Sequence, residues 1–198
     1  SSTCLFCGAG EDTRGLAGRT ACTSCDPGMY RPASSPPLCA DSTCPRGKFG
    51  SIAGQSSEAL ACPGSCSTGK WGNTTSLTAD EQCIACAAGL FDETNTTGKS
   101  MLVNSCTGRC DVGRWSNRSG LTTGAMCPLC PSGRWSAAVA RAASDECTAC
   151  AAGKFGTHEG FTVETAACDG VCSAGRHADG KDGLASGAAC APCAAGRF

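Results

Sequence analysis

Cysteine is the residue type in this chain whose number and spacing could carry chemistry. The chain has 198 residues, and 20 of them are cysteine. The cysteines form ten close pairs, which begin at Cys4, Cys22, Cys39, Cys62, Cys83, Cys106, Cys127, Cys147, Cys168 and Cys190. Cysteine pairs serve as disulfide crosslinks, as zinc ligands or as redox catalysts.

The spacing of the cysteine pairs is also compatible with zinc binding. Two CxxC pairs separated by 15 to 20 residues also occur in zinc ribbons, so five Cys₄ zinc sites are an alternative. Redox catalysis needs one CxxC at the start of a helix in an α/β pattern, and the sequence shows no such pattern. Ten uninterrupted pairs at a nearly constant period favour disulfides. We therefore expect no metal and no cofactor, and an extracellular chain, secreted or at the cell surface.

The other reactive side chains do not form a recognisable site. His158 and His177 have no carboxylate or serine partner in a known motif. Asp179 and Asp182 flank Gly180 as in a calcium loop, but the other oxygen ligands that such loops supply at regular spacing are missing. Because no nucleophile, base and orienting partner can be named, we expect that the chain is not an enzyme.

Composition narrows the class of protein further. The formal net charge is −1, from 16 basic and 17 acidic residues, so the chain lacks the excess of basic residues that is typical of nucleic-acid-binding proteins. No apolar stretch is long enough to span a bilayer, and we expect no membrane insertion within this stretch. Six Phe, three Trp and one Tyr cannot build a large core, so crosslinks must stabilise the fold. The start of the sequence does not resemble a signal peptide, so we expect that it begins after processing or within a longer chain.

The chain is a tandem repeat with a period of about 21 residues. A glycine stands three positions after the second cysteine of every pair: Gly10, Gly28, Gly47, Gly69, Gly89, Gly113, Gly133, Gly153, Gly175 and Gly196. Two positions further on stands an aromatic residue in eight repeats: Tyr30, Phe49, Trp71, Phe91, Trp115, Trp135, Phe155 and Phe198. His177 and Asp12 take this position in the other two, and the residue before it is usually Lys or Arg.

Each repeated residue has a structural interpretation. The glycine predicts a turn with positive φ or a close approach to a disulfide. The aromatic ring should lie over the neighbouring disulfide, and the preceding Lys or Arg should point to solvent if the segment is a strand. The loops are rich in Gly, Ser, Thr, Asn and Asp, which favour turns. The sequence thus predicts a small disulfide-rich fold with little regular secondary structure, an elongated tandem array of about nine repeats with short β-hairpins across residues 1–198.

The repeat resembles a known class of extracellular module. The segments Cys25-Asp26-Pro27-Gly28-Met29-Tyr30 and Cys150-Ala151-Ala152-Gly153-Lys154-Phe155 are similar to the ephrin-receptor-like cysteine-rich repeat, which is related to part of the tumour-necrosis-factor-receptor module. In that class the second cysteine of one pair bonds to the first cysteine of the next pair. The resemblance therefore implies nine disulfides, namely Cys7–Cys22, Cys25–Cys39, Cys44–Cys62, Cys66–Cys83, Cys86–Cys106, Cys110–Cys127, Cys130–Cys147, Cys150–Cys168 and Cys172–Cys190.

This pairing leaves Cys4 and Cys193 without partners. An exposed free thiol is a liability in an oxidising compartment, so we expect each to bond to a preceding or following repeat or to another chain. Repeat proteins also need polar capping units, and none is recognisable at either end. The expected partners are therefore further repeats, in a longer chain or in a filament.

Three sequons indicate N-linked sugar. Asn73-Thr74-Thr75, Asn95-Thr96-Thr97 and Asn117-Arg118-Ser119 satisfy N-x-[ST], and their asparagines are 22 residues apart. Asn104-Ser105-Cys106 fits only the rare cysteine variant. We expect glycans on Asn73, Asn95 and Asn117, because a common register should place them on exposed loops.

The uniformity of the repeats favours a structural role. We expect an extracellular glycoprotein element of a fibril, a surface coat or a hair-like appendage. The alternative is the ligand-binding ectodomain of a receptor or adhesin, for which exposed Phe161 and Leu102-Val103 are candidate contacts.

Overall fold

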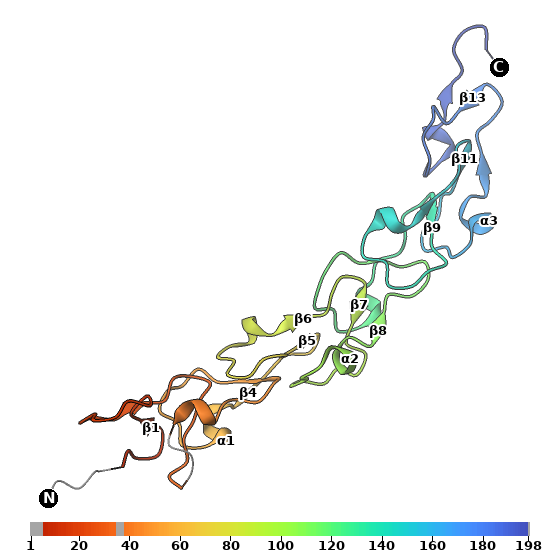
Figure 1. Cartoon of the computed structure of the whole chain (residues 1–198). Helices are drawn as coiled ribbons and strands as arrows, with labels where there is room; N and C mark the ends of the chain where they lie inside the picture. Colours follow the sequence, from red (N-terminus) through yellow and green to blue (C-terminus); the bar gives the residue numbers. More distant parts are fainter. Residues whose placement is uncertain (1–5, 35–37, 198) are drawn as a thin grey trace, which may run out of the picture. The chain divides into compact units, whose positions relative to one another are not determined.

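The computed structural model describes residues 6–34 and 38–197 (Figure 1). Its strands are only two residues long, and they pair as seven antiparallel hairpins in the described part of the chain. The hairpins are β1 (Glu11–Asp12) with β2 (Thr23–Ser24), β3 (Lys48–Phe49) with β4 (Gly64–Ser65), β5 (Lys70–Trp71) with β6 (Ile84–Ala85), β7 (Leu90–Phe91) with β8 (Gly108–Arg109), β9 (Arg134–Trp135) with β10 (Thr148–Ala149), β11 (Lys154–Phe155) with β12 (Gly170–Val171), and β13 (Arg176–His177) with β14 (Ala191–Pro192).

Every hairpin follows the same register. The two residues after the turn glycine pair with the residues just before the second cysteine of the next pair, so Lys48 faces Ser65 and Phe49 faces Gly64. In the two repeats that lack a named strand pair, the same pairing is reduced to single bridges, Met29–Thr43 and Arg114–Leu129. The structural repeat therefore runs from the second cysteine of one pair to the second cysteine of the next. Repeats 1 to 9 begin at Cys7, Cys25, Cys44, Cys66, Cys86, Cys110, Cys130, Cys150 and Cys172.

A short helical turn lies before or at the first cysteine of most pairs. Three of these turns are α-helical: α1 (Glu58–Ala61), α2 (Leu102–Ser105) and α3 (Glu164–Ala167). Five are 3₁₀ turns: η1 (Cys39–Asp41), η2 (Asp80–Gln82), η3 (Gly124–Met126), η4 (Ser144–Glu146) and η5 (Gly187–Ala189). The α-helical turns all precede pairs with three intervening residues, Cys62/Cys66, Cys106/Cys110 and Cys168/Cys172.

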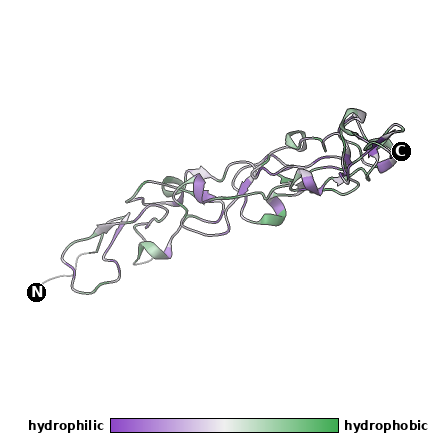
Figure 2. Ribbon diagram, turned by 90° about the horizontal axis from the view of Figure 1, so that it is seen from above, coloured by the Kyte–Doolittle hydropathy of each residue, from purple (hydrophilic) through white to green (hydrophobic). Residues whose placement is uncertain are grey.

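The chain divides into two compact units. One comprises the residues up to Ala85 together with Thr94–Ser105, and the other comprises Cys86–Glu93 together with the residues from Cys106 onward. Among the described residues, neither unit has one large core. The buried apolar residues form five small clusters, each built on the cysteines of one disulfide or on a disulfide cysteine with apolar neighbours. Figure 2 shows hydrophobic and hydrophilic residues interspersed along the chain.

The expected fold class is confirmed. Nine disulfides at regular spacing and short two-stranded hairpins make a small disulfide-rich repeat array. A crosslink that closes a loop of about 15 residues stabilises the folded state by roughly 3 kcal/mol in the chain-entropy model. The disulfides therefore supply stabilisation that a large apolar core would give in an ordinary domain.

Candidate functional site: repeat junctions and exposed loops

In five of the repeats, the aromatic residue packs against the disulfide of the following repeat. Tyr30 lies on the cluster of Cys44, Ala61 and Cys62, and Phe49 lies on the cluster of Cys66, Leu77 and Cys83. In the second compact unit Phe91, Trp135 and Phe155 pack in the same way on the clusters that contain Cys127, Cys168 and Cys190. The ring covers sulfur, as expected, and it also joins two repeats.

The number of residues between the two cysteines of a pair varies with the aromatic residue that faces the pair across the hairpin. Phe49, Phe91 and Phe155 face Gly64, Gly108 and Gly170, and a Cβ at any of these glycines would overlap the phenyl ring. All three glycines lie in pairs with three intervening residues. Trp71 and Trp135 instead face Ile84 and Thr148, in pairs with two intervening residues. The sequence contained this covariation, which the sequence analysis missed.

A loop residue with left-handed backbone joins each repeat to the one before it. Its N–H donates to the carbonyl oxygen of a cysteine that begins the preceding repeat, as in Gly183 to Cys150 at 2.8 Å and Ser76 to Cys44 at 3.0 Å. The left-handed loop residues are Gly54, Ser76, Gly98, Gly120, Ala140, Gly160 and Gly183, and all seven have φ between 59° and 77°. Repeats 3 to 9 each supply one of them.

The same loop residue also contacts the repeat two places earlier. A Cβ on the turn glycine Gly28 would lie 2.6 Å from the carbonyl oxygen of Ser76, and one on Gly133 would lie 2.6 Å from that of Gly183. The turn glycines from Gly10 to Gly133 are buried, and their φ lies between 71° and 82°. The expected positive φ is therefore confirmed, but the expected close approach to a disulfide is wrong, because the close neighbour is the backbone of a loop.

A small buried residue follows the aromatic position. Its N–H donates to the carbonyl of the residue after the left-handed loop residue, as in Gly156 to Leu184 at 3.1 Å and Ser136 to Phe161 at 3.0 Å. No side chain fits at Gly50 or Gly156, because a Cβ there would overlap the backbone at Ala61 or Ala167. This position was also missed in the sequence analysis.

Arg31 is the large side chain at this position in repeat 2. Its N–H still donates to the Gln55 carbonyl, and its side chain makes the contact with the first cysteine carbonyl of the preceding repeat that a loop N–H makes in later repeats. Its guanidinium donates to the carbonyls of Cys7, Gly8 and Glu11 at 3.1, 2.7 and 2.9 Å. Repeats 1 and 2 close loops of 15 and 14 residues, whereas the later disulfides span 17 to 20. Among the residues that the structure describes, the carbonyl of Cys7 thus accepts from a side chain and not from a loop N–H.

The basic residue before the aromatic position is partly exposed, and it is also paired. Lys48, Lys70 and Lys154 each form an ion pair with the carboxylate ten residues later, at 3.1, 2.6 and 3.1 Å. Arg114, Arg134 and Arg176 donate instead to the carbonyl of the next disulfide cysteine, at 2.8 to 2.9 Å. No acidic residue stands ten positions after these arginines.

Asp80 forms one of these ion pairs, with Lys70, and it accepts further hydrogen bonds. Partial burial acts to raise the pKa of Asp80, but hydrogen bonds from Lys70 and Ser67 outweigh it and hold the pKa below the ordinary value. The Ser67 N–H lies 2.8 Å from one carboxylate oxygen and Lys70 Nζ lies 2.6 Å from the other. Asp80 is therefore a structural acceptor and not merely a solvated loop end.

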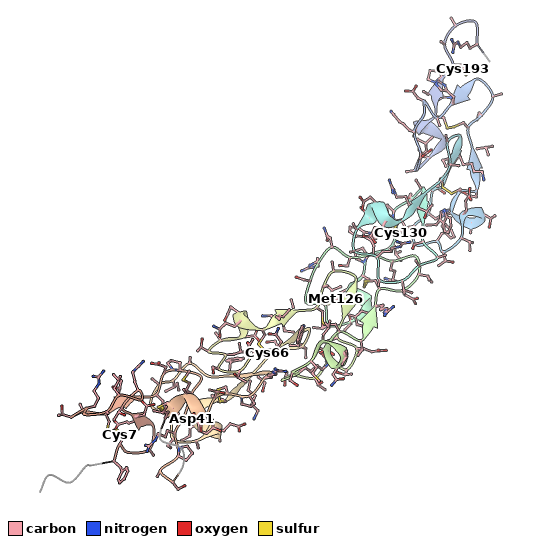
Figure 3. All side chains as sticks on the ribbon, viewed as in Figure 1. Cys7, Asp41, Cys66, Met126, Cys130 and Cys193 are labelled. Carbon is pink, nitrogen blue, oxygen red and sulfur yellow. A yellow bond between two sulfur atoms is a disulfide. The ribbon has the colours of Figure 1, made fainter. Side chains whose placement is uncertain are left out.

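The cysteine pairs do not bond internally. The structure joins Cys7–Cys22, Cys25–Cys39, Cys44–Cys62, Cys66–Cys83, Cys86–Cys106, Cys110–Cys127, Cys130–Cys147, Cys150–Cys168 and Cys172–Cys190, the nine pairs that the resemblance implied (Figure 3). In this state their sulfurs are not free to bind zinc. Cys193 is a half-buried free thiol, and Cys4 lies outside the described residues.

All three sequon asparagines are exposed. Asn73 and Asn117 directly follow the buried residues Gly72 and Ser116, so the chain passes from the contact between repeats to the surface at these asparagines. Asn95 lies in the loop of repeat 5 with left-handed backbone, at φ 50°. The hydroxyl residues Thr75, Thr97 and Ser119 are also exposed, so each complete sequon faces solvent.

The remaining candidate residues do not converge on a reaction centre. His177 Nε2 lies 3.6 Å from Asp179, with both side chains well exposed, and His158 makes an edge contact with Phe161 at 6.3 Å. Phe161 itself packs near Trp135, so it is a core residue and not an exposed ligand contact. Leu102 and Val103 do lie on the surface, 47% and 73% exposed. Among residues 6–34 and 38–197, no group of three or more His, Cys, Asp and Glu side chains could hold a metal ion.

No helix in the described part of the chain has the length and apolar character needed to cross a membrane. No protein-family model matches the chain, and no curated protein is similar to it.

Proposed function

We propose that this chain is a structural element of an extracellular glycoprotein that forms a fibril, a surface coat or a hair-like appendage. The observation that carries the proposal is the uniform junction, in which the loops of repeats 3 to 9 each bond backbone-to-backbone to the preceding repeat. A repeat array whose neighbours interlock through backbone atoms can extend without a change of side chains. This property suits a spacer or a coat.

The disulfides support an oxidising environment outside the cell. Eighteen cysteines are consumed in crosslinks that close loops of 14 to 20 residues, and such crosslinks persist mainly in secreted and surface proteins. The resemblance to ephrin-receptor-like repeats agrees with the same compartment.

Glycans on Asn73, Asn95 and Asn117 fit this role. A bulky polar sugar at an exposed loop solubilises the surface and obstructs proteases. None of the three asparagines is a junction residue, so a sugar would not have to displace the loop contacts described above.

One observation favours the alternative, a ligand-binding ectodomain. Met101, Leu102 and Val103 are consecutive, 49%, 47% and 73% exposed, and lie at α2 in the longest disulfide loop, Cys86–Cys106. Consecutive exposed apolar residues often mark an interaction site. A protein ligand of a receptor would be expected to contact this loop.

The secreted protein tests the proposal. Glycosidase treatment followed by intact-mass measurement should remove sugar, and Asn73→Gln should remove one glycan because it deletes an exposed acceptor. Asn104→Gln is the matched control, since Asn104 is exposed but lies beside disulfide-bonded Cys106. Electron microscopy of the native material should show fibrils or a coat, and discrete particles without sugar would contradict the proposal.

A further inference from the structure

Repeat 1 carries Asp12 in the position that an aromatic residue takes in most other repeats. Where a ring packs on a disulfide, the ring comes from the repeat directly before that disulfide, as Tyr30 does for Cys44–Cys62. The segment that precedes Cys25–Cys39 in this way is the hairpin β1–β2, which contains Asp12. The lack of a ring for this disulfide is therefore caused by a substitution inside repeat 1.

A cavity lies at the corresponding place beside this disulfide. It has a volume of about 230 Å³, and its lining includes Asp12, Leu38 and both cysteines of Cys25–Cys39. Leu38 directly precedes the first cysteine of its pair, as Ala61 does in the cluster that holds Tyr30. None of the described residues that line the cavity is aromatic. We call this space the ring cavity, because the positions around it are those that surround a ring in an occupied repeat.

The Asp12 side chain is held at one wall of the ring cavity by the backbone. One carboxylate oxygen accepts from the N–H of Arg14 at 2.8 Å, and the other accepts from the N–H of Cys39 at 2.7 Å. Asp12 is only 5% exposed, so these two bonds supply partners that water does not. Because both oxygens have partners, a ring can enter beside Asp12 without leaving a buried polar group unsatisfied.

The other lining residues favour a ring that has a basic group beside it. Met29 and Leu38 are half-buried and offer apolar contact, and a thioether sulfur interacts favourably with an aromatic ring. Arg14 pairs with Asp26 at 2.8 Å, and both side chains are about half exposed. Two carboxylates, Asp12 and Asp26, and one guanidinium give the lining a formal charge of −1. A cationic group next to the ring is therefore attracted, and an anionic group is repelled.

We propose that the ring cavity binds an aromatic side chain of a partner protein, presented next to a lysine or arginine. The chain presents its own rings in this order, since a basic residue directly precedes Phe49, Trp135 and Phe155. The half-exposed pair of Arg14 and Asp26 can contact the polar groups that flank a ring in a peptide, which a free aromatic molecule lacks. Phe6, at 94% exposed, is preceded by Leu5 and lacks the basic neighbour.

Titration of the full chain with short blocked peptides tests the proposal. The probes are the N-acetylated dipeptide amides lysyl-phenylalanine, lysyl-alanine and glutamyl-phenylalanine, and NMR follows the methyl signals of Met29 and Leu38. The lysyl-phenylalanine peptide should shift these signals saturably and bind at least about tenfold more tightly than the lysyl-alanine peptide, because only the ring buries apolar area. It should also bind more tightly than the glutamyl-phenylalanine peptide, and added salt should reduce that advantage.

Two variants of the chain locate the binding. Asp12→Phe gives repeat 1 a ring of its own and should abolish the peptide-induced shifts. Leu38→Ala removes part of the wall and should weaken binding at least about threefold. Leu60→Ala is the matched control, since Leu60 is 56% exposed, lies in α1 and does not line the cavity. Peptide mapping of the Cys25–Cys39 bond verifies folding, and Leu38→Ala tests the proposal even if Asp12→Phe fails to form that bond.

Three results would overturn the proposal. Equal binding of the lysyl-phenylalanine and lysyl-alanine peptides, or unchanged binding in Leu38→Ala, would show that no ring enters the cavity. Toluene that bound as tightly as the lysyl-phenylalanine peptide would assign the cavity to small aromatic molecules. Shifts of the Met29 and Leu38 signals on Phe6→Ala without peptide would show that the chain's own ring occupies it. The inference goes beyond the proposed structural role, so its failure would leave that role standing, and an absence of glycans would leave the peptide result standing.

Discussion

The carbonyl oxygen of Gly183 lies 2.6 Å from the point that the Cβ of an alanine at Gly133 would occupy. The two residues belong to repeats 9 and 7, so the contact bridges across a whole repeat. Because Gly133 also has φ 77°, two separate costs oppose a side chain there.

Gly133→Ala should therefore destabilise the contact between repeats 7 and 9 by more than backbone strain alone would. A left-handed alanine costs roughly 1–2 kcal/mol, and crowding at a packed site adds about 1–3 kcal/mol. Gly180→Ala is the matched control, since Gly180 has φ 69° but open space around its Cβ position. Hydrogen exchange of the Gly183 N–H should accelerate in the first variant only, and equal effects of the two variants would contradict the junction.

Gly170→Ala should displace the ring of Phe155 without any effect of backbone handedness. The added Cβ would lie 2.6 Å from the ring atom Cδ2 of Phe155, and Gly170 does not have positive φ. Aromatic proton shifts of Phe155 and a lower thermal midpoint report the change. Val171→Ala removes a 68% exposed side chain next to it and should leave both unchanged; an unaltered Phe155 signal in Gly170→Ala would refute the packing account.

The cysteine pairs, the turn glycines and the aromatic positions were enough to predict the class of fold, because each is a repeated residue with one physical role. The residues that contact these repeated positions were harder to predict. Lys154 and Glu164 are ten residues apart, and no general spacing rule links them outside a known hairpin. The covariation of Phe155 with Gly170 could have been found by aligning the repeats on the second cysteine.

The left-handed loop residues could not be identified from the sequence. Five of them are glycine, but Ser76 and Ala140 adopt the same backbone because the junction imposes it. Loop glycines such as Gly18 and Gly180 also have positive φ and make no such contact. Tertiary contacts, and not local sequence, decide which loop residue docks.

Asp80 should titrate below the ordinary aspartate value. Its folded-state pKa is lowered by Lys70 and Ser67, so its contribution to stability is present above the unfolded pKa and is lost as pH falls through the folded value. Carboxyl-carbon NMR across the acidic range measures the midpoint, which Lys70→Met should raise. Lys48→Met removes a different ion pair and should not move it, and an Asp80 midpoint at or above the ordinary value would contradict the pairing.

Peptide mapping of the secreted, non-reduced protein before and after glycosidase treatment tests the central claim most directly. The account predicts peptides crosslinked between successive pairs, such as Cys44–Cys62 and Cys150–Cys168, together with glycosidase-sensitive sugar on the peptides that carry Asn73, Asn95 and Asn117. Disulfides within the pairs, or free thiols with bound zinc and no sugar, would contradict a crosslinked extracellular glycoprotein.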